Sequence, residues 1–418
     1  MLHLLLPLLL FISNIVQSHS AIIESLLGFL GDLPLKLETR YVGAGELEEV
    51  QLFYYFLESE RSPEDDPLLL WLTGSPGCSA LSGLLFQIGL LRFDYSNSSG
   101  NKPLLKLNLY SWTKIANIIF LDALVGTEFS YATTGRAYNS SDTSSLAQMY
   151  EFLRKWLLAH PKSLANPFYI TGDSYSGIVV PIIVQEVYDG NEAGHEPLLN
   201  LKGYVQGNPV TCKEKDIGQR IRYGHKMALI SDELYESTKT DCKGDYMNVD
   251  PTNGACLADL EMVSLCLETI RWPHILVPRC NVMSRDHTRL KWSRNILEEN
   301  IVDIISMSQQ SRLWCGDYNY LYSYIWANDM KVREGRHIRE STKKEWNRCN
   351  YSLSYTKDVL NSAVYHRYLS KKSLRALIYS GDHDLGIPYV ATLDWIRSLN
   401  LTLLASWSPW FVEGQVAG

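Results

Sequence analysis

The stretch Gly172–Gly177, which reads Gly-Asp-Ser-Tyr-Ser-Gly, holds the residues best suited to nucleophilic chemistry. It fits the Gly-x-Ser-x-Gly pattern of a sharp strand-to-helix turn, on which Ser174 would stand exposed between small residues that permit a strained backbone. The start of such a helix directs free N–H groups and a partial positive charge at an oxyanion. Because apolar residues flank the pattern on both sides, we interpret Ser174 as a nucleophile, with an ordinary turn as the alternative.

A serine nucleophile needs a base, and the base needs a carboxylate that orients it. In chains with this kind of turn, an acid on a loop after a late strand follows the serine, and a histidine comes last. Asp382 fits the acid position because it follows the apolar stretch Ala376–Tyr379, although a solvated turn aspartate fits there too. The single histidine after Asp382 is its neighbour His383, which would point to the opposite side of an extended loop. Earlier histidines could reach the site only from an inserted segment: His225, His274 and His337.

Apolar runs predict the strands that would position these residues. Leu47–Leu57 alternates apolar and polar residues, and two continuous apolar runs are typical of buried strands: Pro67–Leu72 and Asn117–Asp122. Two later stretches are interpreted as further strands: Leu201–Asn208 and Arg375–Tyr379. Residues 146–160 have helical spacing and stop before Pro161. This order predicts an α/β hydrolase fold, a central sheet flanked by helices. The loop Thr73–Ser79 follows an early strand, where that fold places a second oxyanion N–H, although a plain turn explains it equally well.

Composition bounds the class of protein. The chain has 418 residues, of which 46% are hydrophobic and 20% charged, as in folded globular proteins. Its net charge of −7 argues against a nucleic-acid-binding surface. Seven of the eight cysteines fall between Pro209 and Leu369, where strand-like runs are few. We therefore predict a disulfide-stapled cap over residues 209–369, inserted between the core segments 21–208 and 370–418.

The N-terminus and the cysteines indicate export. Residues 4–12 are apolar but too few to span a bilayer, and small residues follow, so residues 1–20 are interpreted as a cleaved secretory signal, with an N-terminal anchor as the alternative. The cysteines form no close Cys-x-x-Cys pairs, which favours disulfides over zinc. Four sequons are available for glycosylation, at Asn97, Asn139, Asn350 and Asn400. The predicted protein is secreted, extracellular or vacuolar, with no membrane segment after cleavage and no metal or organic cofactor.

Four stretches resemble the signatures of the serine carboxypeptidase family: Pro67–Ser79, Ala116–Asp122, Gly172–Gly177 and Tyr379–Asp382. Matches run from about Tyr41 to Gly418. The resemblance implies an α/β hydrolase with a cap, acting on a peptide or a small-molecule ester. It also implies roles for individual residues: Ser174 as nucleophile, Asp382 as triad acid, the N–H groups of Ser75 and Tyr175 as oxyanion hole, and Thr73, Gly74 and Asp173 as substrate contacts. The implied disulfides are Cys78–Cys349, Cys242–Cys256 and Cys280–Cys315, which leaves Cys212 and Cys266 unassigned.

Several positions depart from the peptidase pattern. Thr73 and Asp173 stand where the peptidases usually have Asn and Glu, which grip the peptide's terminal carboxylate. Both resemble the plant branch of the family that includes acyltransferases, which move acyl groups from glucose esters to other alcohols. Ser75 replaces a glycine of the oxyanion loop, and the loss of one oxyanion donor costs about 2.7–4 kcal/mol. Leu124 and Glu128 replace a family Pro and Gly.

The resemblance places the triad histidine after the Gln-Val-Ala-Gly motif with which the sequence ends. The sequence therefore predicts a C-terminally truncated form with at best residual activity, and a final strand with an unpaired edge. Three functions follow as hypotheses: a carboxypeptidase acting through a serine acyl-enzyme, an acyltransferase that uses glucose esters, and a non-catalytic product. The sequence determines neither the substrate nor the oligomeric state.

Overall fold

The computed structural model describes residues 21–279, except 75 and 100–101, and residues 316–418, except 340–341 and 343–344. Three predictions lie outside the described residues: the leader over residues 1–20, the backbone N–H of Ser75, and the disulfide Cys280–Cys315. No helix in the described ranges is long and apolar enough to cross a membrane.

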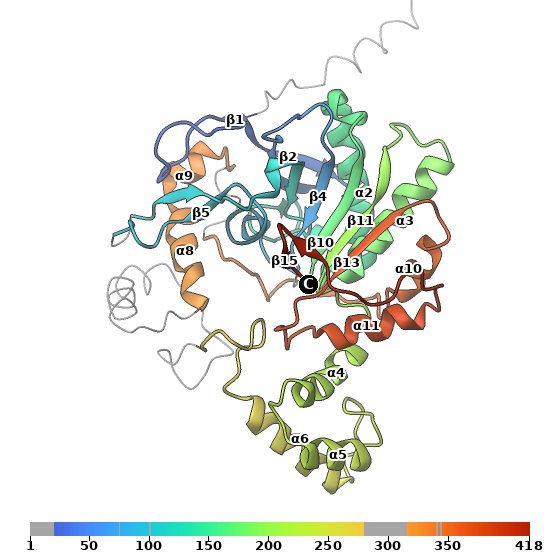
Figure 1. Cartoon of the computed structure of the whole chain (residues 1–418). Coiled ribbons are helices and arrows are strands. Elements are labelled where there is room, and N and C mark those ends of the chain that lie inside the picture. Colours follow the sequence, from blue (N-terminus) through green and yellow to red (C-terminus); the bar gives the residue numbers. More distant parts are fainter. Residues whose placement is uncertain (1–20, 75, 100–101, 280–315, 340–341, 343–344) are drawn as a thin grey trace, which may run out of the picture.

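A nine-stranded sheet forms the centre of the molecule (Figure 1). Its order is β1-β2-β3-β7-β4-β10-β11-β13, and β8 pairs with β3. The strands from β1 to β7 pair antiparallel, whereas β7, β4, β10, β11 and β13 are mutually parallel. The predicted α/β arrangement is confirmed. The strand bounds are β1 Ala21–Ile23, β2 Leu37–Ala44, β3 Val50–Leu57, β4 Leu68–Leu72, β7 Asn117–Leu121, β8 Tyr131–Ala132, β10 Phe168–Asp173, β11 Leu201–Gly207 and β13 Arg375–Tyr379.

The remaining strands form short two-stranded ladders outside the central sheet. Their bounds are β5 Leu91–Phe93 with β6 Leu105–Leu107, β9 Ser140–Ser141 with β12 Tyr355–Thr356, and β14 Phe411–Val412 with β15 Gln415–Val416.

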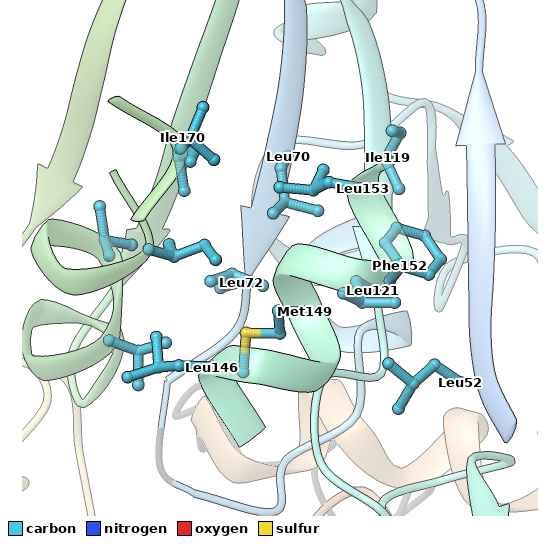
Figure 2. Packing of buried hydrophobic residues seen from close by; sticks show 14 of the residues in the cluster. Leu52, Leu70, Leu72, Ile119, Leu121, Leu146, Met149, Phe152, Leu153 and Ile170 are labelled. Atoms are coloured by element: carbon cyan, nitrogen blue, oxygen red, sulfur yellow. The ribbon is translucent and has the colours of Figure 1, made fainter. Parts of the chain in front are cut away.

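Helices cover the sheet because its central strands are apolar on both sides. Every residue of β4 and β7 is buried, as expected for strands between two helical layers. Helix α2 (Asp142–Ala159) begins at a capping box formed by Ser141 and Ser144, and α3 (Ser176–Glu192) follows β10. Figure 2 shows the apolar side of α2 packed on the strands, with these residues in contact range: Leu146, Met149, Phe152 and Leu153 from α2, and Leu52, Leu70, Leu72, Ile119, Leu121 and Ile170 from the sheet.

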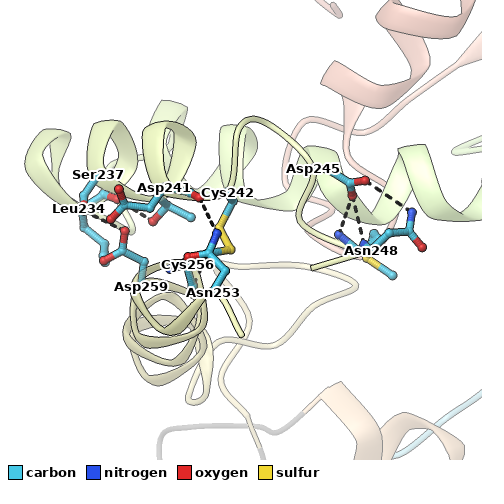
Figure 3. The surroundings of a disulfide bond; sticks show 11 residues. Leu234, Ser237, Asp241, Cys242, Asp245, Asn248, Asn253, Cys256 and Asp259 are labelled. Atoms are coloured by element: carbon cyan, nitrogen blue, oxygen red, sulfur yellow. Dashed lines mark hydrogen bonds between the residues drawn. A yellow bond between two sulfur atoms is a disulfide. The ribbon is translucent and has the colours of Figure 1, made fainter. Parts of the chain in front are cut away.

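Helices α4 (Lys213–Lys226), α5 (Asp232–Asp241) and α6 (Gly254–Leu267) form a lobe beside the sheet (Figure 1). They share a separate apolar cluster, and the predicted disulfide Cys242–Cys256 joins the end of α5 to α6 (Figure 3). The side-chain amide of Asn253 caps α6 and also donates to the carbonyl of Asp241 at 2.8 Å. This lobe corresponds to the first part of the predicted cap.

The second part of the predicted cap packs against the core. Helices α8 (Leu321–Asn328) and α9 (Met330–Gly335) belong to the same apolar cluster as Trp71 of β4, and α10 (Ala363–Leu369) packs on α3. The predicted disulfide Cys78–Cys349 joins the loop after β4 to a segment 271 residues later. Helix α11 (Tyr389–Ser398) then packs against α4. The cap boundaries 209–369 thus remain a prediction, since a single lobe does not describe this segment.

Asp216 in the first turn of α4 makes the stability of the fold depend on pH. Its carboxylate accepts hydrogen bonds from the backbone N–H groups of Thr211 (2.7 Å) and Cys212 (3.0 Å), and burial raises its pKa from 3.8 to about 6. Between these two pKa values the folded chain retains a proton that the unfolded chain has released. The contribution is therefore full below pH 3.8 and is lost as pH rises through about 6.

For the wild type we expect the free energy of unfolding to fall by about 2 kcal/mol from this group between pH 4 and pH 7. Asp216→Asn keeps an oxygen acceptor but cannot titrate, so its unfolding free energy should lack this fall. Denaturant titrations at a series of pH values measure the difference. Equal pH slopes for the two proteins would contradict the assignment.

Candidate active site

Ser174 lies on the turn between β10 and α3. Its φ angle is 55°, a left-handed conformation that non-glycine residues rarely adopt. The turn is held by backbone hydrogen bonds: the N–H of Ser174 donates to the carbonyl of Gly207 (2.9 Å), and the carbonyl of Ser174 accepts from Gly177 (3.0 Å) and Val210 (2.9 Å). The predicted strand–turn–helix geometry around Ser174 is confirmed. A hydrogen bond to the end of β11 holds the strained backbone at Ser174.

Two glycines let other chain segments approach this turn. A Cβ atom on Gly74 would lie 2.4 Å from the Cβ of Ser174 and 2.5 Å from the carbonyl oxygen of Asp173. A Cβ atom on Gly172 would lie 2.4 Å from the carbonyl oxygen of Leu72. Contacts this short do not occur in folded proteins, so only glycine fits at either position. The loop after β4 therefore lies directly against the serine turn, as the sequence predicted.

Asp173 connects the same loop to the turn. Its Oδ1 accepts the backbone N–H of Gly74 at 3.0 Å, and its Oδ2 accepts the side-chain amide of Gln87 at 2.8 Å. Gln87 is in turn oriented by the indole N–H of Trp71, which donates to its Oε1 at 3.0 Å. Burial raises the pKa of Asp173, while the Gly74 and Gln87 donors oppose that shift. The sequence interpretation missed Gln87, although its position as a polar side chain in the apolar run 81–91 was a usable signal.

Thr73 and Tyr175 line a small cavity of about 30 Å³ behind the turn, together with Leu124, Thr127 and Tyr355. That volume holds about one water molecule. The hydroxyls of Thr73 and Thr127 are buried there without a hydrogen-bond partner among the described residues. The backbone nitrogen of Tyr175 lies at the start of α3 and within 3.0 Å of where a Gly74 Cβ would be. A water-sized cavity thus lies beside Tyr175, whose backbone N–H is one of the predicted oxyanion donors.

Asp142, at the start of α2, fixes the ring of Tyr175. Its Oδ1 accepts the hydroxyls of Tyr175 (2.8 Å) and Tyr355 (2.5 Å), and its Oδ2 accepts the backbone N–H of Val359 (3.0 Å). Burial and the Asp142 carboxylate raise the pKa of both tyrosines, so both remain neutral donors. The side chain of Tyr175, the residue after Ser174, is therefore held in place by Asp142.

Two aspartates follow β13, and the structure distinguishes them. The side chain of Asp382 is 77% exposed, and its Oδ1 lies 3.6 Å from Nδ1 of His383. Asp384 is half-buried, its Oδ1 accepts the backbone N–H groups of Gly386 (2.7 Å) and Ile387 (3.2 Å), and burial raises its pKa to about 6. An oriented, partly desolvated carboxylate suits a triad acid better than a solvated one. This geometry favours Asp384 over the predicted Asp382.

Five of the described histidines make contacts away from Ser174, and His195 and His337 are exposed. His160 binds Glu38 (3.0 Å) and His225 binds Asp232 (2.6 Å). His366 is buried against the hydroxyl of Tyr204 at 2.9 Å, and burial lowers its pKa to about 4. The rings of His274 and His383 lie 5.1 Å apart near the Asp382 loop. No hydrogen bond joins Ser174 to a histidine among the residues that the structure describes.

A buried charge network lies behind the loop after β4. Glu128, in a left-handed conformation (φ 42°), accepts hydrogen bonds from the hydroxyls of Tyr55 (2.7 Å) and Ser79. Arg336 donates to the Tyr55 hydroxyl at 2.7 Å and lies 3.7 Å from Glu128, and both charged side chains are at most 1% exposed. Asp122 accepts the backbone N–H of Ala80 at 2.7 Å, and its pKa is raised well above the usual range by burial and by Glu128. The network therefore places the Arg336 guanidinium beside two buried, closely spaced carboxyl groups, of which Asp122 is held against ionisation.

The sequons differ in accessibility. Asn97, Asn139 and Asn400 are exposed, whereas Asn350 is half-buried beside the disulfide-bonded Cys349. The side-chain amide of Asn350 donates to the carbonyl of Gly126 at 3.0 Å, so a glycan there would remove a native contact. We expect glycans on the three exposed asparagines and little or none on Asn350. Site-specific mass spectrometry of the protein expressed through a secretory pathway measures this, and high occupancy at Asn350 would contradict it.

Comparisons with known proteins agree with this geometry. The family model for serine carboxypeptidases matches residues 28–418. Serine carboxypeptidase-like 10 of Arabidopsis thaliana is 46% identical over 418 residues, which cover 100% of this chain and 89% of that protein. Serine carboxypeptidase-like 19 of the same plant is 45% identical, with 99% and 90% covered.

Among solved structures, a prohormone-processing carboxypeptidase from Saccharomyces cerevisiae superposes with a TM-score of 0.66 at 17% identity, over 87% of this chain and 77% of that one. This likeness supports the α/β hydrolase fold. Together with the family match over nearly the whole sequence, it establishes that the chain belongs to the serine carboxypeptidase family.

Proposed function

We propose that Ser174 attacks an acyl carbonyl and forms an acyl-enzyme. The observation that carries this proposal is the strained turn at Ser174, packed against Gly74 at the start of a helix. The oxyanion of the tetrahedral intermediate would accept the N–H of Tyr175 and that of residue 75. Asp384, rather than Asp382, is our candidate for the acid that orients the base.

The first candidate reaction is the release of a C-terminal residue from a peptide, with water as the acceptor of the acyl group. The family match and the names of the relatives support it, since serine carboxypeptidases act on peptides.

The second candidate is acyl transfer from an uncharged ester, such as a glucose ester, to a small-molecule hydroxyl. The position of Asp173 favours it. Both carboxyl oxygens of Asp173 accept N–H donors next to Ser174, so they remain acceptors where a peptide would place its own terminal carboxylate. Two close carboxylates repel unless they share a proton. A neutral sugar or alcohol hydroxyl meets no such repulsion and can donate to Asp173.

The hydrogen bonds of the described residues assign no histidine to Ser174, and His383 is paired with an exposed carboxylate. The disulfides and the exposed sequons support a secretory route for this protein, extracellular or vacuolar.

The decisive experiment is labelling with a fluorophosphonate probe, followed by two assays on the same preparation. Labelling should be measurable in the wild type and absent in Ser174→Ala. Release of a C-terminal residue from a blocked dipeptide would support the first candidate, and transfer from a glucose ester to an alcohol the second. If Ser174→Ala labels as strongly as the wild type, the assignment of the nucleophile is wrong. If neither protein labels, the non-catalytic hypothesis replaces it.

A further inference from the structure

The loop that carries Asp384 is held by the lobe formed by α4, α5 and α6. Leu385, the next residue in the chain, is fully buried in the apolar cluster of that lobe, together with Tyr223 of α4. The backbone N–H groups of Leu385 and Gly386 both donate to the carbonyl of Trp272, at 2.8 and 3.1 Å, in the segment after α6. The lobe therefore determines where this loop lies.

Arg220 of α4 is bonded to the same loop. Its Nε and Nη2 atoms both donate to the carbonyl oxygen of Gly386, at 2.9 and 2.7 Å. The guanidinium carbon also lies 4.4 Å from the centre of the Trp272 ring, within the range of cation–π contacts. Two hydrogen bonds and a ring contact thus fix the planar group of this half-buried arginine.

The carbonyl of Gly386 and the N–H of Ile387 belong to one peptide group. This peptide is trans, so it is planar and its C=O and N–H point in opposite directions. Because Arg220 fixes the oxygen, it also fixes the direction of the N–H, which donates to Oδ1 of Asp384 at 3.2 Å. The orientation of the Asp384 carboxyl group is therefore linked to Arg220 through a single peptide group.

The charge of Arg220 acts on the same carboxyl group. Burial raises the pKa of Asp384 to about 6, and the positive charge of Arg220 opposes this rise. Arg220 acts in the same direction on Asp216 in the first turn of α4, and burial lowers its own pKa while both carboxylates oppose that shift. Arg220 thus favours the ionised form of Asp384, which is the form that orients a base.

We propose that Arg220 is a positioning residue, which orients the carboxylate of Asp384 through the peptide between Gly386 and Ile387. Its role in catalysis rests on the proposed function, in which Asp384 is the triad acid. The lobe then contributes to the reactive centre as well as to the fold, since α4 carries the residue that places the acid.

Three variants test the proposal. Arg220→Met keeps most of the aliphatic stem but removes the donors and the charge. Arg220→Lys keeps the charge, but an ammonium group lacks the planar fork of donors. Arg222→Met is the matched control, because Arg222 lies on the same helix and its guanidinium pairs with Asp394 of α11 at 3.2 Å.

Two measurements report on Asp384 without any catalysis. Hydrogen exchange at the Ile387 amide should be about tenfold faster in Arg220→Met than in the wild type, and unchanged in Arg222→Met. The carboxyl NMR signal of Asp384, assigned with Asp384→Asn, should titrate at about pH 6 in the wild type and at higher pH in Arg220→Met. Arg220→Lys should restore the titration but not the slow exchange. Unchanged exchange at Ile387 in Arg220→Met, or equal acceleration of the β13 amides, would overturn the proposal.

Fluorophosphonate labelling separates this proposal from the proposed function. If Asp384 is the triad acid, Ser174 should be labelled about tenfold more slowly in Arg220→Met, and Arg220→Lys should recover part of the rate. Unchanged labelling with faster exchange at Ile387 would retain Arg220 as the positioning residue and show that Asp384 is not the triad acid. Slower labelling with unchanged exchange would mean that Arg220 does not act through this peptide, and the proposal would fail.

Discussion

Gly74→Ala is expected to lower the rate of fluorophosphonate labelling at Ser174 by about 100-fold, because a displacement of about 1 Å in a reactive centre costs that much. The added Cβ would lie 2.4 Å from the Cβ of Ser174, 2.5 Å from the carbonyl of Asp173 and 3.0 Å from the nitrogen of Tyr175. Two of these three atoms are backbone, so no rotamer change relieves the contact. Either the loop after β4 retreats from the oxyanion position, or the serine turn moves.

Gly135→Ala is the matched control for this substitution. A Cβ on Gly135 meets no atom within 4 Å, and its φ of −60° suits any residue, so labelling should be unchanged. Melting temperatures should accompany both measurements, since a folded Gly74→Ala protein that labels slowly shows a local effect. Labelling of Gly74→Ala at the wild-type rate would mean that the loop after β4 does not form part of the reactive centre.

Arg336→Met is expected to lower the free energy of unfolding by about 3–5 kcal/mol, the usual cost of leaving one partner of a buried ion pair alone. Arg336 is 1% exposed, lies 3.7 Å from Glu128, and donates to the hydroxyl of Tyr55 at 2.7 Å. Its guanidinium also lies 4.9 Å from the ring centroids of Phe129 and Trp326. Methionine fills much of that space but leaves the Glu128 carboxylate uncompensated.

The double variant Glu128→Gln with Arg336→Met separates charge from packing. It removes both charges while an oxygen acceptor remains for Tyr55 and Ser79, so most of the lost stability should return. Denaturant unfolding of the wild type, both single variants and the double variant completes the cycle. Additive losses would show that Arg336 acts through its aromatic contacts and not through Glu128.

Local signals in the sequence were sufficient to predict the turn at Ser174 and the strands around it. Gly172 and Gly177 bracket Ser174 within six residues, and the apolar runs at β4 and β7 require burial on both sides whatever surrounds them. The other contacts of the site join residues that are distant in sequence, and local patterns do not predict them. Gln87 lies 86 residues from Asp173, and nothing in the serine motif indicates the contact.

The sequence also could not show which of Asp382 and Asp384 is the better candidate for the triad acid. Both follow the same strand, and contacts with helix α4 shape their loop: Tyr223 donates to the carbonyl of Asp382 at 2.6 Å, and Arg220 donates to the carbonyl of Gly386 at 2.7 Å. Helices α8 and α9 fall in the predicted cap because its cysteines are many and its strand-like runs few, yet Trp326 is buried at 2% exposure in the main core. Burial of this kind depends on the completed fold and not on local pattern.

The disulfide between Cys78 and Cys349 determines when the surroundings of Ser174 can close during synthesis of the chain. The segment next to Ser174 is anchored on both sides of that bond, by Ser79 donating to the carbonyl of Arg348 and Asn350 donating to the carbonyl of Gly77, each at 2.8 Å. A ribosome must therefore pass residue 349 before the surroundings of Ser174 can close. Until then Ser174 lies in an unfinished pocket, and its completion requires oxidation of the two cysteines.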